Sequence, residues 1–382
     1  MVCESPSSAG YAGTTGYFPT YVTVGIFAWN EESGIALMLQ TLFRQSLFAE
    51  LRERNLTCEI ICVANGCTDQ TVSLATEAID AQKRGHPQTA SFNARVAEIT
   101  RRGKANAWNE FVHSFSSREA QFLFMMDADI VLDDPDTLWK LLTVLEADPH
   151  ASATVDRPCK DITRKLRKNL WDRLSLGSSL MTQSSEAQLC GQLYCIKASV
   201  ARAIYLPRDL AACEDGFIKA LVCTDLLTGP CVPDRLRVVP EAGHYFAAYT
   251  TPAAVIRNQK RQIIGQTLVH ILIDECLIHR PPSAWGRLGE WIRERDRMDP
   301  AWLKRLIWDH LQRTRWWWRL YPGMIDSPFR RLRKVGGIKR LKCVPAAIAR
   351  CVLALVSGFL AFRSLRTGCM DYWPHSRPAK TD

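Results

Sequence analysis

Four short apolar runs lie in the first 130 residues of the chain, and each is followed by a segment with helical spacing of its apolar side chains. The runs cover residues 22–27, 59–64, 96–99 and 122–126. After each run, apolar residues recur at intervals of three and four, which is the period of a helix with one buried face. This repeated alternation predicts βαβ units, and therefore an α/β fold with a mostly parallel sheet flanked by helices.

One helix is predicted after each run. The first begins near residue 34, the fourth covers 137–147, and the faces of the second and third contain Val72, Ala75, Ile79 and Trp108, Phe111, Val112, Phe115. Thr68 precedes the second helix and is predicted to be its N-cap, because a threonine hydroxyl accepts hydrogen bonds from the free N–H groups of a first turn.

Polar side chains follow all four runs. In right-handed βαβ units the loops after the strands lie at one edge of the sheet, so these residues are expected to converge. They are Asn30, Glu31, Asn65, Asp69, Arg102, Lys104, Asp127 and Asp129.

Asp127 and Asp129 follow the last and most apolar run, separated by the small Ala128. Two carboxylates at the end of a buried strand suit a divalent cation held against a diphosphate, because hard cations take oxygen ligands and keep positions open for phosphate. Such a pair alone is equally compatible with a strand that ends in a turn with solvated acids. The expected convergence with the other polar residues favours the metal site.

The chain contains neither of the common glycine-rich phosphate loops, G-x-G-x-x-G or G-x-x-x-x-G-K-[ST]. Phosphate is therefore expected to be held by a metal ion and basic side chains. Gly103 and Lys104 suit this task, because the free N–H groups of a helix N-terminus add to the lysine charge. The alternative for Lys104 is a solvated lysine in the first turn.

The order of motifs resembles glycosyltransferase family 2, the inverting nucleotide-sugar transferases with the GT-A fold. Residues 24–32 (VGIFAWNEE) resemble its first strand and P-x-[YW]-N-E loop, with Ala28 in place of proline, and residues 63–71 (VANGCTDQT) are similar to V-D-D-G-S-T-D-x-T, with Asn65 at the second acid. Residues 102–109 (RGKANAWN) resemble x-G-K-x-x-A-L-N, and residues 127–129 resemble the D-x-D motif. In the family the second acid contacts the nucleobase or the ribose, so with Asn65 at this position the resemblance does not identify the nucleobase of the donor.

The second half of the chain extends the resemblance. Residues 191–197 are similar to the acceptor-side strand G-x-x-x-x-x-[RK], Glu214 and Asp215 resemble the E-D pair at the start of a helix, and residues 261–265 resemble R-W-x-x-G with glutamine in place of tryptophan. The matches run from about residue 21 to 268 in family order.

The resemblance implies a role for each matched residue. Donor-binding residues are Ala28, Asn30, Glu31, Asn65, Asp69, Gly103, Lys104, Asp127 and Arg261. Asp127 and Asp129 would hold Mn²⁺ or Mg²⁺, with His244 as a third ligand; a structural or surface histidine is the alternative. Asp215 is the expected general base and Glu214 its competitor, although two acids also suit any helix N-terminus.

Composition and charge narrow the setting. The chain has a net charge of +10, which favours an anionic partner such as a nucleotide or an acidic membrane face. Its fourteen cysteines include no C-x-x-C pair, and the first residues lack a secretory signal, so a reducing cytoplasmic compartment is expected. No aromatic RNA-stacking motif or zinc module is present, which argues against nucleic acid as the partner.

The last part of the chain is basic and aromatic, then apolar. Residues 311–342 contain ten Lys or Arg, one acid and a run of three tryptophans, and residues 343–362 are apolar apart from Arg350. Arginine within this segment and basic residues on both sides of it favour a helix in the membrane interface over a crossing helix. The alternative is an amphipathic helix docked on the catalytic domain.

The expected organisation has five parts. They are a flexible lead-in (1–20), a nucleotide-sugar-binding half (21–150), an acceptor-binding half (151–275), a helical Trp/Arg-rich segment (276–342) and an apolar, membrane-associated tail (343–382). The leading interpretation is a metal-dependent glycosyltransferase acting on a lipid-linked or envelope glycan at the cytoplasmic face of the membrane. The alternatives are a sugar nucleotidyltransferase and a catalytically silent binding protein with a membrane-binding tail.

Overall fold

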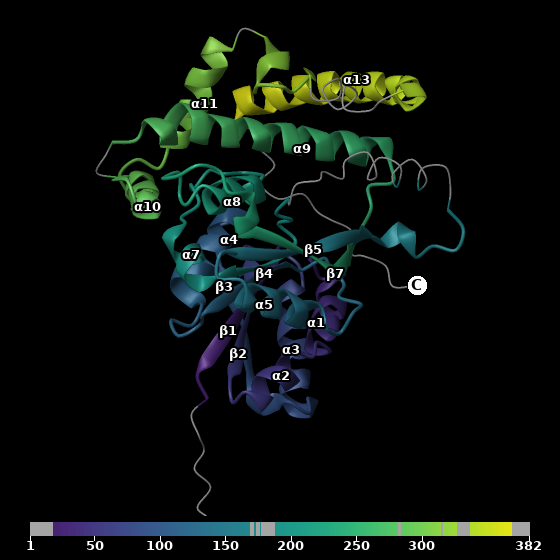
Figure 1. Ribbon diagram of the computed structural model, residues 1–382, viewed down its shortest axis with the longest axis vertical. Helices are drawn as coiled ribbons and strands as arrows, with labels where there is room; N and C mark the ends of the chain where they lie inside the picture. The colour runs from purple at the N-terminus through teal and green to yellow at the C-terminus, as the bar shows by residue number, and fades with distance from the viewer. Residues whose placement is uncertain are drawn as a thin grey trace, which may run out of the picture.

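A seven-stranded sheet is the centre of the computed structural model, which describes residues 18–168, 172, 176, 188–281, 284–314, 316–326 and 337–368 (Figure 1). The strand order is β3-β2-β1-β4-β6-β5-β7. The strands are β1 (Thr20–Ala28), β2 (Thr57–Asn65), β3 (Phe92–Ile99), β4 (Phe122–Asp127), β5 (Ala153–Lys160), β6 (Leu193–Lys197) and β7 (Leu236–Phe246). Of the expected lead-in, residues 1–17 lie outside the described residues, and Thr20 already begins β1.

The four strands predicted from the apolar runs form the parallel half of the sheet. β1 pairs in parallel with both β2 and β4, and β2 pairs in parallel with β3. β6 then pairs antiparallel with β4 and β5, and β5 pairs in parallel with β7. The prediction of a mostly parallel α/β sheet is therefore confirmed, and the carboxyl ends of β1 to β4 share one edge.

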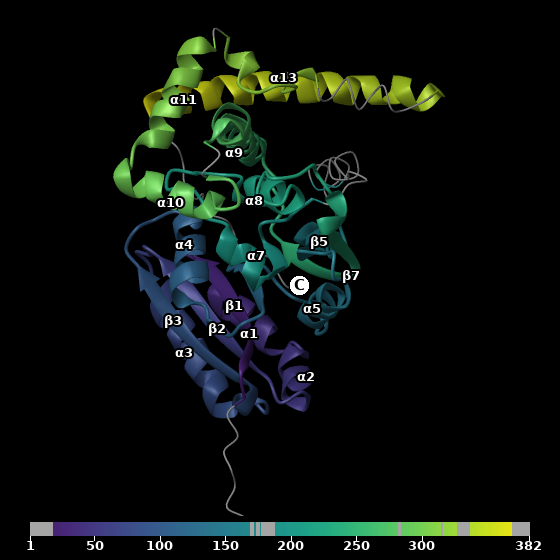
Figure 2. The same ribbon diagram turned by 60° about the vertical axis from the view of Figure 1, so that its left-hand side comes forward.

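Helices cover both faces of the sheet (Figure 2). One face packs against α1 (Ile35–Phe43), α2 (Leu47–Glu53), α3 (Thr71–Gly85) and α5 (Thr137–Ala147), and the other against α4 (Lys104–Glu110), α7 (Ala198–Ala203) and α8 (Glu214–Cys223). β1 serves both cores, since Val24 and Ile26 face the first layer and Phe27 faces the second. Between them, Gly25 admits Phe111, because a Cβ there would lie 2.7 Å from the Phe111 ring.

One local prediction is wrong. α3 begins at Thr71, its N-cap position is Gln70, and no side chain caps it, so Thr68 is not the cap. Asp69 takes over part of the task, since its Oδ1 accepts a hydrogen bond from the Thr71 backbone N–H at 3.0 Å. Thr68 instead bonds to Asn30 in the neighbouring loop.

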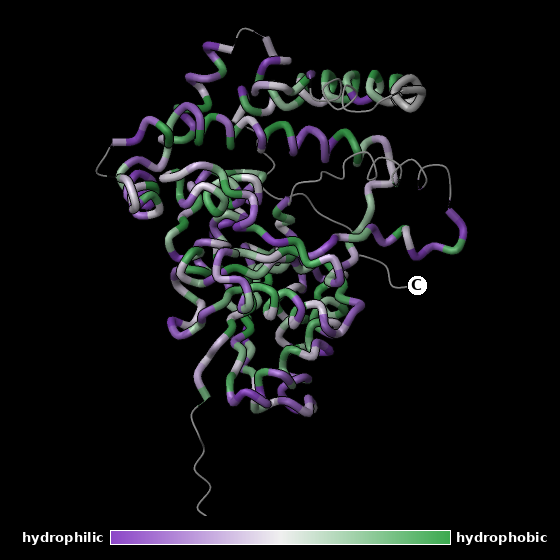
Figure 3. Tube along the Cα trace, viewed as in Figure 1, coloured by the Kyte–Doolittle hydropathy of each residue, from purple (hydrophilic) through white to green (hydrophobic). Residues whose placement is uncertain are grey.

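A layer of helices lies beyond the carboxyl edge of the parallel strands (Figures 1 and 2). It comprises α9 (Pro252–His270) with its continuation Ile271–Cys276, α10 (Leu288–Met298), α11 (Trp302–Arg313) and α13 (Gly337–Thr367). α9 packs against α8 on one side and α13 on the other. Figure 3 shows green, apolar positions in the sheet and mixed colours along α9.

Short turns complete the described structure. They are Thr89–Ser91, Asp161–Thr163, Pro233–Arg235, Leu277–His279 and Trp317–Arg319, with a wider helical turn at Phe111–Phe115 that continues α4. Among the described helices, one stretch, Ala347–Thr367 in α13, is long and apolar enough to cross a membrane by length and composition.

Candidate active site

Two loops at the carboxyl edge of the sheet are tied together by side chains. Asn30 follows β1 with a φ of 54°, and its amide bonds to Thr68 after β2, where the Thr68 N–H donates to Asn30 Oδ1 at 2.8 Å. The backbone N–H of Glu31 donates to Thr71 Oγ1 at 2.7 Å, and that of Glu32 to Asp69 Oδ2 at 3.2 Å. Asn30 and Asp69 therefore hold the two loops together at this edge of the sheet, in addition to any contact that they make with a ligand.

Asn65, the last residue of β2, is fully buried beneath this edge. Neither its side-chain oxygen nor its nitrogen has a hydrogen-bond partner among the described residues. An unpaired buried amide costs about 1–3 kcal/mol, so the site keeps a polar group unsatisfied next to the predicted donor pocket. Gly66 follows with a φ of 61°, in the left-handed region that glycine adopts without strain.

Lys104 joins three elements of the site. Its Nζ lies 2.6 Å from Asp127 Oδ1 at the end of β4, 3.0 Å from Glu214 Oε1 at the start of α8, and 3.0 Å from the carbonyl oxygen of Gly191. The three charged side chains are 8–16% exposed. Gly103, with a φ of 128°, makes the turn that leads into α4.

The charges in this cluster shift one another. Burial raises the pKa of Asp127 to about 6, the Asp129 charge adds to the rise, and Lys104 opposes it. Burial favours the neutral amine of Lys104, but the charges of Asp127 and Glu214 outweigh it and raise the pKa of Lys104 above its usual range. Lys104 is therefore a cation that fixes the position of two acids from different halves of the chain.

The two candidate bases differ in their surroundings. Burial alone would raise the pKa of Glu214, but Lys104 and Arg261 outweigh it and hold that pKa below its ordinary value. Burial and the neighbouring Glu214 charge raise the pKa of Asp215, although the Gly216 N–H donates to its Oδ1 at 2.7 Å. Glu214 is thus held in its ionised form, whereas Asp215 binds a proton more readily.

Gly191 stands directly against this acidic pair. A Cβ at Gly191 would lie 3.2 Å from both Asp215 Cβ and Glu214 Oε1. A side chain at this position would therefore crowd both acids, and the glycine lets the backbone approach them closely.

α9 closes the site through Arg261 and Gly265, which lie one turn apart. The Glu214 charge outweighs the effect of burial and raises the pKa of Arg261. A Cβ at Gly265 would lie 2.1 Å from Cys213 Sγ, so this glycine lets α9 approach the start of α8. Cys213 itself has a φ of 57° immediately before the acidic pair.

His244 lies behind the D-x-D segment on β7. Its Nδ1 is 2.6 Å from Asp156 Oδ2, both side chains are fully buried, and its Nε2 is 3.4 Å from Gln192 Oε1. Paired backbone hydrogen bonds between Val131 and Tyr245, at 2.9 and 3.0 Å, attach the D-x-D segment to this strand. A carboxylate on Nδ1 is the arrangement that orients a metal-binding histidine, and the ligand role of His244 stays a prediction.

The acids of the site provide part of the ligand set that a hard divalent cation needs. Within the described ranges, no three His, Cys, Asp or Glu side chains form a ready-made metal cluster. Asp127 and Asp129 nevertheless repel each other, and with Glu214 and Asp215 they outnumber the nearby cations Lys104 and Arg261. Two carboxylates completed by substrate phosphates are a usual Mg²⁺ or Mn²⁺ site, so the chemistry of the donor set suits the predicted ion.

Several residues near the site were not predicted from the sequence. Gly191 and Gln192 lay inside a quoted motif without a role, and the Gln192 carbonyl accepts a hydrogen bond from the Asp127 N–H at 2.9 Å. No sequence motif pointed to Asp156, because its partner His244 lies 88 residues away in the chain. Tyr249 is affected by the charges of Arg261 and Asp129, and burial raises its pKa.

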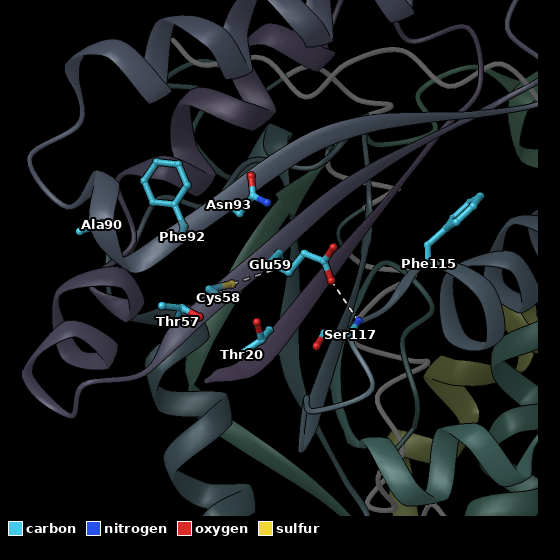
Figure 4. Close-up of a pocket in the computed structure, with 9 residues that line it drawn as sticks. All are labelled: Thr20, Thr57, Cys58, Glu59, Ala90, Phe92, Asn93, Phe115 and Ser117. Atoms are coloured by element: carbon cyan, nitrogen blue, oxygen red, sulfur yellow. Dashed lines mark hydrogen bonds between the residues drawn. The ribbon is translucent and has the colours of Figure 1, made fainter. Parts of the chain in front are cut away.

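A separate hollow of about 400 Å³ lies at the other end of the strands (Figure 4). It is lined by residues of β1, β2 and β3 together with Ala90, Phe115 and Ser117, and Glu59 Oε2 accepts a hydrogen bond from the Ser117 N–H at 3.0 Å. None of the predicted site residues lines it.

Comparison with known proteins gives the following matches. Residues 23–199 match the model of the family "Glycosyl transferase family 2". No curated protein matches the chain. Similar solved structures include a mannosyltransferase, PcManGT, from Pyrobaculum calidifontis with GDP-Man and Mn²⁺ (17% identity, 93% of this chain and 88% of that chain, TM-score 0.47). Others are TarS 1–349 of S. aureus with UDP (16%, 91% and 92%, 0.42) and glucosyl-3-phosphoglycerate synthase of M. tuberculosis with Mn²⁺, UDP-glucose and phosphoglyceric acid (14%, 69% and 82%, 0.44).

Proposed function

We propose that the chain is a nucleotide-sugar-dependent glycosyltransferase with a GT-A-type sheet, because residues 23–199 match glycosyl transferase family 2. We propose that it transfers a sugar with inversion, in a metal-dependent reaction, to a hydroxyl of a lipid-linked or envelope glycan at the cytoplasmic face of the membrane. The single observation that carries the mechanism is the contrast between Glu214, paired with Lys104, and the protonatable Asp215 beside it.

Asp215 is the general base in this proposal. It accepts the proton of the acceptor hydroxyl while that oxygen attacks the anomeric carbon from the face opposite the nucleotide. A raised pKa suits a residue that must take up a proton near neutral pH. The bond between the anomeric carbon and the diphosphate oxygen breaks in the same step, and the nucleoside diphosphate leaves with the electron pair of that bond.

The other acids and cations hold the donor. Asp127 and Asp129 would hold Mn²⁺ or Mg²⁺, which supplies positive charge to the departing diphosphate when bound. Lys104 and Arg261 add fixed positive charge on the same side of the sheet. Asn65 offers its unpaired amide to the nucleobase, Ala28, Glu31 and Gly103 shape the donor pocket, and His244 is proposed as a further ligand.

Nucleotide release tests this function. Wild type, Asp129→Ala, Asp215→Asn and Glu214→Gln are assayed with UDP-, GDP- and dTDP-sugars and manganese, magnesium or chelator. We expect one donor to be turned over only with metal, Asp129→Ala to lose donor binding, and Asp215→Asn to lose turnover while still binding the donor. Glu214→Gln should lower turnover less than Asp215→Asn, because it keeps the base.

Other outcomes overturn specific parts of the proposal. Equal losses in both acidic variants with donor binding intact would remove Asp215 as the single base. A product whose anomeric configuration equals that of the donor, as read by NMR, would refute inversion. Release of pyrophosphate from sugar phosphate and nucleoside triphosphate would favour the nucleotidyltransferase alternative.

A further inference from the structure

The inward face of α13 is made of small residues and packs on the protein. Ala354, Ser357, Gly358 and Ala361 are buried, and the helix lies along α9. A Cβ at Gly358 would lie 2.9 Å from Met324 Cε, so close packing depends on the small side chains of this face. With this face held by protein, α13 is not free to be surrounded by lipid.

The outward face of α13 is made of large apolar residues that stay about half exposed in the described structure. Ile348, Val352, Val356 and Phe359 are 46–53% exposed. Their spacing of four, four and three residues places them in one line along the helix, about 16 Å long at 1.5 Å per residue. We call these four residues the α13 stripe.

Cationic and aromatic residues adjoin the α13 stripe. Arg363 and Arg366 are exposed where the stripe ends. The ring of Trp317 meets Phe359 edge-on at 5.9 Å, and the half-exposed Trp316 stacks on Trp318 at 4.6 Å. Tryptophan and arginine beside an apolar strip are the composition of a surface at the boundary between lipid and water.

Charge decides between a lipid surface and a second copy of the chain. Residues 337–368, which include α13, contain six Lys or Arg and no acid. Two copies meeting through the α13 stripe would bring these helices together, and like charges oppose that contact. Four half-exposed side chains also offer well under the roughly 800 Å² that each partner contributes to a standard interface.

We propose that the α13 stripe docks on the surface of an anionic lipid bilayer, with the helix lying in the plane of the interface. The four apolar side chains enter the acyl boundary, and the neighbouring cations attract the lipid headgroups. The proposal deepens the membrane location stated above, and rests on the proposed function only for that location. Lipid binding and donor binding are measured separately, so failure of one is distinguishable from failure of the other.

Vesicle flotation of the full chain tests the docking. The vesicles contain either phosphatidylcholine alone or equal parts of phosphatidylcholine and phosphatidylglycerol. We expect wild type to float with the anionic vesicles and at least tenfold less with the neutral ones. The double variant Val352→Glu/Val356→Glu should lose at least tenfold in binding, and Arg363→Gln/Arg366→Gln should lose severalfold on anionic vesicles only.

The control variant is Met298→Glu, which adds a glutamate on α10 at a side chain that is 76% exposed. It should float like wild type, and all variants should keep the wild-type unfolding temperature and circular dichroism, because every altered residue is exposed. Lack of vesicle binding by wild type, or unchanged binding of the stripe variant, overturns the proposal. A dimer that the stripe variant breaks, without vesicle binding, assigns the surface to self-association. Resistance to alkaline carbonate extraction would show a crossing helix instead.

Discussion

Replacing Lys104 by methionine tests whether this lysine holds the acidic cluster together. Its ammonium lies 2.6 Å from Asp127 and 3.0 Å from Glu214, and all three side chains are at least 84% buried. Methionine keeps much of the length of the side chain but leaves two carboxylates without their cation. Removing one partner of a buried ion pair costs about 3–5 kcal/mol, and we expect a loss in that range at neutral pH.

The loss should shrink as the pH falls. Without Lys104, the folded-state pKa of Asp127 rises further above its unfolded value, and the pKa of Glu214 loses one of the two cations that hold it below its ordinary value. The folded variant therefore binds more protons than folded wild type at the same pH. Its stability relative to wild type therefore recovers as the pH falls from neutral towards about 5. A simple packing defect would give a loss that does not depend on pH.

Urea unfolding with chelator present measures the effect, and Lys140→Met is the matched control. Lys140 pairs with Asp134 at 2.5 Å, but these side chains are 34% and 36% exposed. Such a surface pair contributes about 0–1 kcal/mol. A Lys104→Met loss no larger than that of Lys140→Met, or one that is constant between neutral and acid pH, would refute the reasoning.

Two further predictions concern parts of the fold outside this cluster. Gly265→Ala should cost about 1–3 kcal/mol of stability in thermal unfolding, because the new Cβ would lie 2.1 Å from Cys213 Sγ. The control is Gly85→Ala, which should be nearly neutral because nothing lies within 4 Å of its Cβ. Equal effects of the two substitutions would contradict the steric argument. Glu275 accepts hydrogen bonds from His310 at 2.6 Å and from Arg313, and these contacts outweigh burial and lower the pKa of Glu275. Its stabilisation is therefore present above the unfolded pKa of about 4.5 and is lost as the pH falls through the lower folded value. Glu275→Gln should cost about 1–2 kcal/mol at neutral pH in urea unfolding, and progressively less as the pH falls below about 4.5; a constant difference would contradict this.

The parallel half of the sheet could be predicted because its signals are local. Each strand is a continuous apolar run, each helix repeats with its own period, and the right-handed crossover rule brings the loops to one edge. The fourth helix matches its predicted bounds, Thr137–Ala147. Strand ends and caps were less accurate, as at Thr68, because these depend on neighbouring loops that meet only after folding.

The antiparallel half and the site contacts could not be read in the same way. β6 inserts between β4 and β5, so the sheet order departs from the chain order and no local pattern announces it. Likewise, Asp156 meets His244 across 88 residues, and the sequence shows only a lone histidine. The order of the motifs predicted that Lys104 and Asp127 lie at the same edge of the sheet. That they form an ion pair could be seen only from the distance in the structure.

The Lys104 contacts also bear on how a donor would enter. The lysine was predicted to face phosphate, whereas in the structure its ammonium faces Asp127, Glu214 and the Gly191 carbonyl. One ammonium cannot compensate two carboxylates and a diphosphate at the same time, so a donor that arrives alone would meet uncompensated negative charge. If the proposed metal ion is required, we therefore expect the requirement to appear first in donor binding and only then in turnover, because a divalent ion held by Asp127 and Asp129 would free the lysine charge for the phosphates.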